Sequence, residues 1–194
     1  MSFEHLNDDT IKEILMIQDR LKVMETKNKS KESFLDYVKH VWPEFVEGEH
    51  HRLFASKLEA VAQGKIKRLI VNMPPRHTKS EFASVFFPSW FMGLKPNTKI
   101  MQTTHTAELS VRFGRKVRNL MDQNEYKQIF DNVGLSADSK SAGRWETDKG
   151  GEYFAAGVGG AITGRGADLL IIDDPHSEQD ALSPSALELS LIHI

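Results

Sequence analysis

The chain has 194 residues and a mass of 22.0 kDa, which is enough for one ordinary domain with a sizeable core. Its 40% hydrophobic and 27% charged residues exclude a collagen-like or wholly disordered chain, and its net charge of −2 gives no overall electrostatic reason to bind nucleic acid or membranes. The absence of cysteine excludes disulfides, thiolate zinc sites and a cysteine nucleophile. Because no signal-peptide or membrane-span pattern is seen, we expect a soluble intracellular protein.

Helical spacing of apolar residues predicts three helices in the first third of the chain. They cover residues 6–24, 33–41 and 50–63. The polar run ETKNKSKE at residues 25–32 has the composition of a flexible connector, Trp42 and the proline after it end the second helix, and Gly64 is typical of a residue just past a helix end. We therefore expect residues 1–41 to form a helical N-terminal appendage with its connector, and residues 42–194 to form the main domain.

From residue 68 onward, short apolar runs alternate with helical patterns. Strands are expected at residues 68–73 (RLIVNM), 98–103, 151–158 and 168–173 (DLLIID), and helices at residues 79–92 and 106–122. Short β-branched runs of this kind are typical of strands that are buried on both faces. The alternation predicts an α/β fold with a mainly parallel central sheet flanked by helices.

The segment PPRHTKSE, residues 74–81, lies between a predicted buried strand and a helix, where phosphate-binding loops occur. Amides at a helix start can hold phosphate oxygens, Lys79 would add a positive charge, and Ser80 would supply an oxygen ligand for Mg²⁺. The general pattern G-x-x-x-x-G-K-[ST] fails here, because Met73 and Thr78 stand at its glycine positions. A basic helix start after a proline turn is an equally good interpretation of this segment alone.

The run LLIIDD, residues 169–174, is an apolar strand that ends in two carboxylates. Adjacent residues at a strand end point to different sides, so Asp173 could reach a metal ion while Asp174 orients or deprotonates water. Two solvated acids before Pro175 are the alternative. Downstream of a Lys-Ser pair, however, the two acids favour nucleotide binding over this alternative.

These segments resemble the N-terminal ATPase half of the large terminase subunit of tailed bacteriophages, the motor that drives genomic DNA into the procapsid. The resemblance covers most of residues 42–175 and is strongest in PPRHTKSE and TGRGADLLIIDDP. This family uses a deviant phosphate loop, with an arginine in place of the usual glycine-rich run. The resemblance therefore implies ATP and Mg²⁺ as cofactors, double-stranded DNA as a partner, and a P-loop ATPase domain over residues 42–194.

The resemblance also implies roles for single residues. The implied phosphate-binding set is Arg76, His77, Thr78, Lys79 and Ser80. Arg76 matches the arginine that approaches the γ-phosphate, where a planar bidentate donor suits the developing charge. Ser80 and Asp173 match the Mg²⁺ ligands. Asp174 stands where many family members have a glutamate, and is the candidate catalytic base.

Other basic residues and two histidines have several interpretations. Arg165 lies in a glycine turn before the acidic strand, and we expect it at the same edge of the sheet as the acids, as a second phosphate sensor, a DNA contact, an intersubunit finger or only a surface arginine. The helix at residues 106–122 carries a basic cluster that could contact DNA but is more often a solvated face: Arg112, Arg115, Lys116 and Arg118. His50 and His51 lack a metal-site pattern and are expected to be buried or capping histidines.

Members of this family act as homo-oligomeric rings on the capsid, with the portal protein and a small terminase subunit as partners and a C-terminal nuclease that cuts concatemers. The implied location is the host cytoplasm and, transiently, the procapsid, with no membrane. Few residues follow Asp174, so we expect a fragment with an incomplete ATPase domain and no nuclease, in which LELSLIHI does not continue the native sequence. Two rival functions remain: another P-loop DNA-dependent ATPase of the helicase type, and a non-catalytic DNA-binding or assembly module.

Overall fold

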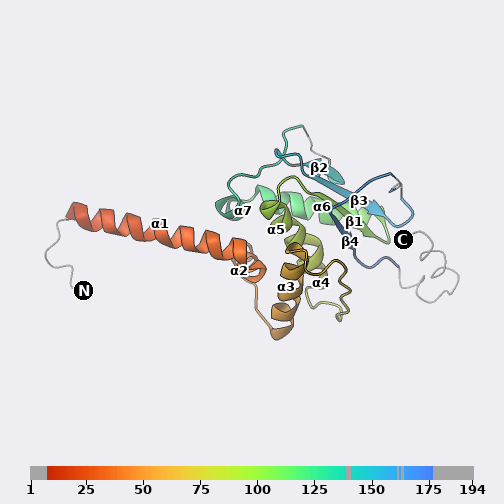
Figure 1. Cartoon of the computed structure of the whole chain (residues 1–194), viewed down its shortest axis with the longest axis horizontal. Coiled ribbons are helices and arrows are strands. Elements are labelled where there is room, and N and C mark those ends of the chain that lie inside the picture. Colours follow the sequence, from red (N-terminus) through yellow and green to blue (C-terminus); the bar gives the residue numbers. More distant parts are fainter. Residues whose placement is uncertain (1–7, 139–140, 161, 163, 177–194) are drawn as a thin grey trace.

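The computed structural model describes residues 8–138, 141–160, 162 and 164–176, so the expectation for LELSLIHI lies outside the described residues. The helices are α1 (Asp8–Glu32), α2 (Phe34–Val41), α3 (Glu49–Ala62), α4 (Lys79–Glu81), the π-helical η1 (Phe82–Phe86), α5 (Phe87–Leu94), α6 (Ala107–Asp122) and α7 (Asn124–Ile129). The strands are β1 (Lys99–Thr104), β2 (Arg144–Glu146), β3 (Glu152–Gly157) and β4 (Leu169–Ile172). Figure 1 shows an α/β body from which α1 projects.

The four strands form one mixed sheet in the order β2-β3-β1-β4. Strand β1 is parallel to both of its neighbours, and β2 is antiparallel to β3. The expected α/β class is confirmed, as are the strands expected at residues 98–103, 151–158 and 168–173, each to within one residue at either end. Strand β2 was not predicted because three residues are too few for a pattern; its Trp145 is fully buried and stacks on Tyr153 at 4.9 Å between ring centroids.

The hydrophobic core contains residues from the sheet and from α2, α3, η1, α5, α6 and α7. Helix α6 packs against β1 and β3. In the same core, Phe34 of α2 lies 5.5 Å from Phe82, 5.9 Å from Phe87 and 5.5 Å from Trp90, measured between ring centroids. Aromatic pairs at such distances add stabilisation beyond their buried area. Helix α2 is therefore part of the same core as the sheet, and packing gives no domain boundary at residue 41.

The expected flexible connector at residues 25–32 is wrong, because α1 remains helical to Glu32. Tertiary contacts fix this end of the helix. Ser30 is buried, and its carbonyl accepts a hydrogen bond of 2.8 Å from the indole Nε1 of Trp90. The ammonium of Lys27 lies 2.6 Å from a carboxylate oxygen of Asp131, just after α7. The polar composition of residues 25–32 therefore belongs to a helix that packs against the body, and not to a linker.

The strand expected at residues 68–73 is also wrong, because the structure assigns no strand there. Burial nevertheless alternates along the segment: Leu69, Val71 and Met73 pack against the core, whereas Ile70 is 88% exposed. That alternation is typical of a strand. No strand of the described part of the chain pairs with this segment, so its side chains follow the sheet pattern without a hydrogen-bond ladder.

The helix expected at residues 79–92 is confirmed but is not uniform. It begins as α4, continues through the π-helical η1 and ends as α5 at Leu94. Short π-helical segments are rare and occur often at functional sites. Gly64 follows α3 with a φ of +73°, as expected for the residue after a helix end. None of the described helices has an apolar stretch long enough to span a bilayer.

Candidate functional site

The carboxyl end of β4 brings the two expected acids to the end of β1. The amide of Asp173 donates to the carbonyl of Thr103 at 3.0 Å, which extends the pairing of the two strands by one residue. The amide of His105 then donates to the carbonyl of Asp174 at 3.1 Å. Asp174 has a φ of +45°, so the chain turns away from the sheet at this residue. The acids are therefore fixed by backbone hydrogen bonds at the carboxyl edge of the sheet.

Lys79 lies between these two acids. Its Nζ donates to Oδ1 of Asp174 at 2.8 Å and lies 3.9 Å from Oδ1 of Asp173. The side chain of Asp173 is 7% exposed and that of Asp174 is 60% exposed, whereas Lys79 is intermediate at 25%. The structure thus brings Lys79 to two adjacent acids that lie more than ninety positions later in the sequence. One buried and one exposed carboxylate share a single ammonium.

Ser84 is a site residue that was not predicted from the sequence. Its hydroxyl donates to Oδ2 of Asp173 at 2.9 Å, and Ser84 itself is fully buried in η1. Ser80, the expected Mg²⁺ ligand, is half-buried in α4. The four-residue spacing between the two serines places both on one face of an ordinary helix, which is the signal that could have identified Ser84.

The backbone before Lys79 adopts left-handed conformations at two residues that are not glycine. Arg76 has a φ of +63° and Thr78 a φ of +61°. Thr78 stands at the second glycine position of the general phosphate-loop pattern, and it has the positive φ that glycine adopts most readily. Such a conformation costs roughly 1 kcal/mol or more for other residues. Arg76 and His77 are exposed, and Nδ1 of His77 donates to the carbonyl of Pro75 at 2.9 Å.

His51 holds Thr78 in place. The amide of Gly48 donates to Nδ1 of His51 at 2.9 Å, so Nδ1 carries no proton and Nε2 does. This Nε2 lies 2.8 Å from the hydroxyl oxygen of Thr78 and therefore donates to it, while the hydroxyl donates to the carbonyl of His77 at 2.6 Å. His51 is buried, which lowers its pKa from 6.5, and the nearby His50 lowers it further. The expectation of a buried or capping histidine is confirmed for His51, whereas His50 is exposed. The bond of His51 to Thr78 was not predicted.

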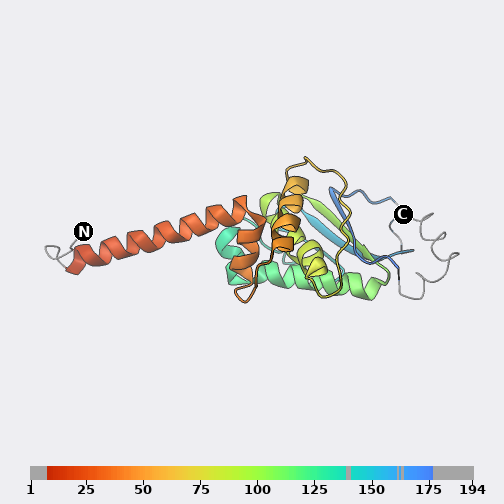
Figure 2. The same cartoon turned by 90° about the horizontal axis from the view of Figure 1, so that it is seen from below.

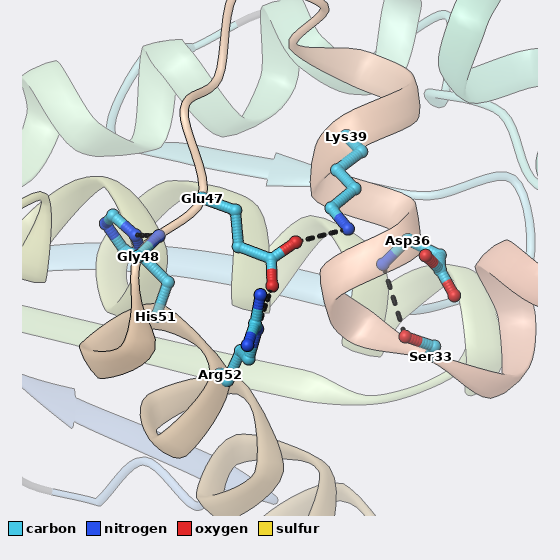
Figure 3. Close-up of polar contacts among 7 residues, drawn as sticks. All are labelled: Ser33, Asp36, Lys39, Glu47, Gly48, His51 and Arg52. Carbon is cyan, nitrogen blue, oxygen red and sulfur yellow. Dashed lines mark hydrogen bonds and ion pairs between the residues drawn. The ribbon is translucent and has the colours of Figure 1, made fainter.

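An ion-paired glutamate supports the start of α3. Figure 3 shows Glu47 between Lys39 of α2 and Arg52 of α3, with His51 turned back toward Gly48. Hydrogen bonds from Lys39, which has the larger effect, and from Arg52 lower the pKa of Glu47 to about 2. Because Glu47 directly precedes Gly48, this pair of contacts fixes the turn that presents the Gly48 amide to His51.

Arg165 lies at the opposite end of the strands from the acids. Its Nη1 donates to a carboxylate oxygen of Glu152, the first residue of β3, at 3.1 Å. The guanidinium also lies 4.1 Å from the ring centroid of Phe154, beside a cavity of about 200 Å³ that Lys99 helps to line. The expectation that Arg165 shares an edge with the acids is wrong, because β4 runs between them and the acids follow its last residue, Ile172.

The basic cluster on α6 is divided between solvent and the body. Arg112 and Arg115 are exposed, and Arg118 is half-buried. Lys116 forms an ion pair with Glu81, the last residue of α4. This contact ties α6 to the helix that carries Lys79, so Lys116 has a structural partner on the side of the candidate site.

The donor set suits Mg²⁺ held together with a phosphate. In the described ranges, no group of three or more His, Asp or Glu residues could hold a metal ion by itself. Mg²⁺ in nucleotide sites usually keeps several waters and uses one or two carboxylates with substrate phosphates. Asp173 fits this use, because Ser84 fixes one carboxylate oxygen while Lys79 Nζ stays 3.9 Å from the other, beyond hydrogen-bond distance. No family model matches the sequence, and comparisons with curated proteins and with solved structures gave no match.

Proposed function

We propose that the chain binds and hydrolyses ATP with Mg²⁺ at the site formed by residues 74–80, Asp173 and Asp174. The observation that carries this proposal is the position of Lys79 between a buried and an exposed carboxylate at the end of a parallel strand. A lysine that follows a tight loop and faces paired acids matches the arrangement that phosphoryl transfer requires. Thr78 supports the same proposal, because its backbone has the left-handed conformation that is usual for the glycine at this position of the general loop.

In this proposal each residue has a separate role. Lys79 exchanges the Asp174 carboxylate for a phosphate oxygen when the nucleotide binds, and the exposed Arg76 adds charge at the γ-phosphate. Asp173 and Ser80 hold Mg²⁺, which neutralises phosphate charge when bound. Asp174, released from Lys79, orients the attacking water. Catalysis of this kind depends on positioning and charge rather than on covalent chemistry.

The motor function rests on the resemblance in PPRHTKSE and TGRGADLLIIDDP. We assign the chain to the ATPase part of a terminase that translocates double-stranded DNA into a procapsid, with the portal protein and a small terminase subunit as partners in a ring. In this proposal the exposed Arg112 and Arg115 on α6 contact DNA phosphates.

The test measures binding of a fluorescent ATP analogue with Mg²⁺ to the wild-type chain and to Lys79→Ala, with the exposed Lys65→Ala as control. Loss of a charge-assisted phosphate contact costs about 1.5–3 kcal/mol, so we expect affinity to fall roughly 10- to 100-fold in Lys79→Ala alone. Unchanged affinity in Lys79→Ala would contradict the proposal. Binding without hydrolysis in the wild type would favour the assembly module, and strand separation would favour a helicase.

A second comparison tests the metal site through the Mg²⁺ concentration needed for nucleotide binding. Ser84→Ala removes the hydrogen bond to Asp173, and we expect a several-fold higher Mg²⁺ requirement. Ser89→Ala is the matched control, because Ser89 is also fully buried in the following helix but bonds Tyr37 and a backbone carbonyl instead. Equal Mg²⁺ requirements in the two variants would contradict the assignment of Asp173 as a metal ligand.

A further inference from the structure

The projecting part of α1 presents apolar side chains to solvent. Figures 1 and 2 show α1 leaving the body in both views, and its packing partners, α2 and α7, lie at its C-terminal end. The exposed large hydrophobic residues of this helix are Leu15, Met16, Ile17, Leu21, Val23 and Met24. Single exposed apolar residues are normal, but a continuous group on one element marks an interaction surface.

Four of the apolar residues of α1 form a stripe. Ile14, Ile17, Leu21 and Met24 follow one another at spacings of three, four and three residues. This is the a/d pattern by which two helices pack together, and it covers one side of the helix. Met16 lies outside the stripe, about 120° around the helix from its centre, and is as exposed as Leu21, at 56% against 55%. The stripe, rather than apolar content in general, is therefore the candidate contact.

The charges along α1 are separated in a way that selects the partner. In residues 9–19, Asp9, Glu13 and Asp19 stand against Lys12, for a net charge of −2. In residues 20–29, Arg20, Lys22 and Lys29 stand against Glu25, for a net charge of +2; Lys27 is left out because it is ion-paired with Asp131 of its own chain. An antiparallel copy of the same helix places each acidic half beside a basic half. A parallel copy places like beside like.

We propose that α1 pairs with α1 of a second copy of this chain in an antiparallel arrangement. The stripe then forms two kinds of layer, Ile14 against Met24 and Ile17 against Leu21, around a two-fold axis near residue 19. Such a contact is self-complementary and closes as a dimer, with the two bodies at opposite ends. The exposed helix from residue 9 to 25 is about 25 Å long, so the interface is small and the dissociation constant is on the order of micromolar.

Sedimentation equilibrium tests the pairing, with Leu21→Glu and the matched Met16→Glu. We expect a reversible dimer of the wild-type chain, a dissociation constant at least tenfold higher for Leu21→Glu, and no change for Met16→Glu. Both residues are exposed, and far-UV circular dichroism checks that the helix content is equal. A wild-type chain that stays monomeric well above micromolar concentration overturns the proposal and leaves the stripe for a different partner helix. Equal effects of the two variants also overturn it.

The absence of cysteine allows the orientation to be tested directly. A mixture of Ile14→Cys and Met24→Cys chains, mildly oxidised, should form the mixed disulfide in preference to either homodimer. Disulfides of Ile14→Cys with itself would indicate a parallel pair and overturn the antiparallel arrangement. The proposal does not depend on nucleotide binding, so it can fail while the ATPase proposal stands.

Discussion

Thr78 shows how one residue can take a conformation that usually belongs to glycine. Its left-handed φ of +61° is unfavourable for a β-branched residue, but its hydroxyl donates to the carbonyl of His77 and accepts from Nε2 of His51. Two hydrogen bonds of this kind offset a conformational cost of roughly 1–2 kcal/mol. The loop before Lys79 therefore depends on a histidine in α3, almost thirty residues earlier.

The protonation of His51 gives a prediction about pH. Its pKa is lowered from 6.5 in the folded chain by burial, so the unfolded chain binds a proton more readily. The contribution of His51 to stability is therefore complete above pH 6.5 and decreases as the pH falls below that value toward the lowered pKa. His51→Gln, which does not titrate, should reduce the slope of unfolding free energy against pH in this window, measured by urea denaturation. An unchanged slope would show that His51 is not a determinant of acid stability.

At the scale of the element, residues 68–73 show which part of a strand can be read from sequence. The β-branched pattern predicts alternate burial, and the alternation is present, because it depends only on side chains next to the core. Pairing depends on a neighbouring strand at the right place, which local pattern does not encode. The predictions of β1, β3 and β4 were confirmed because each of these segments has both the apolar pattern and a hydrogen-bonded neighbouring strand.

Adjacent residues of this segment supply a matched pair of substitutions. Ile70→Lys places a charge where the side chain is already 88% exposed, so the free energy of unfolding should change by no more than about 0.5 kcal/mol. Val71→Lys forces the charge toward the core and should cost about 2 kcal/mol or more. Thermal and urea denaturation measure both. If Ile70→Lys is the more destabilising variant, Ile70 contacts a surface that alternate burial does not reveal.

The site was partly predictable for the same physical reason. Lys79, Asp173 and Asp174 each stand at an element end, and parallel α/β topology brings such ends together. Ser84 and His51 lie within helices, so the position of an element end gives no indication of their role. Only the tertiary packing of η1 and α3 brings them to the site. Arg165 was misplaced because its turn is near the acids in sequence but separated from them by the length of β4.

At the scale of the whole molecule, the chain divides inside α1 rather than after α2. The first part of α1 is exposed, whereas Ser30 and the aromatic residues Phe34 and Tyr37 are fully or almost fully buried. Burial of Tyr37, whose hydroxyl bonds Ser89, raises its pKa well above the ordinary value. A boundary at residue 41 would therefore cut through the core, while a boundary near residue 25 would separate an exposed helix from the body.

Two deletions distinguish these boundaries. A chain that lacks residues 1–24 keeps all of the contacts around Ser30 and Phe34, so we expect its melting temperature to stay within a few degrees of the full chain. A chain that lacks residues 1–41 loses three fully buried side chains of α2, namely Phe34, Tyr37 and Val38. Each large one is worth about 3–5 kcal/mol, against a total stability of about 5–15 kcal/mol for a domain, so this chain should not fold cooperatively. Calorimetry measures both, and a cooperative transition in the shorter chain would restore the boundary at residue 41. The chain without residues 1–24 should also be monomeric, because it lacks all four residues of the stripe.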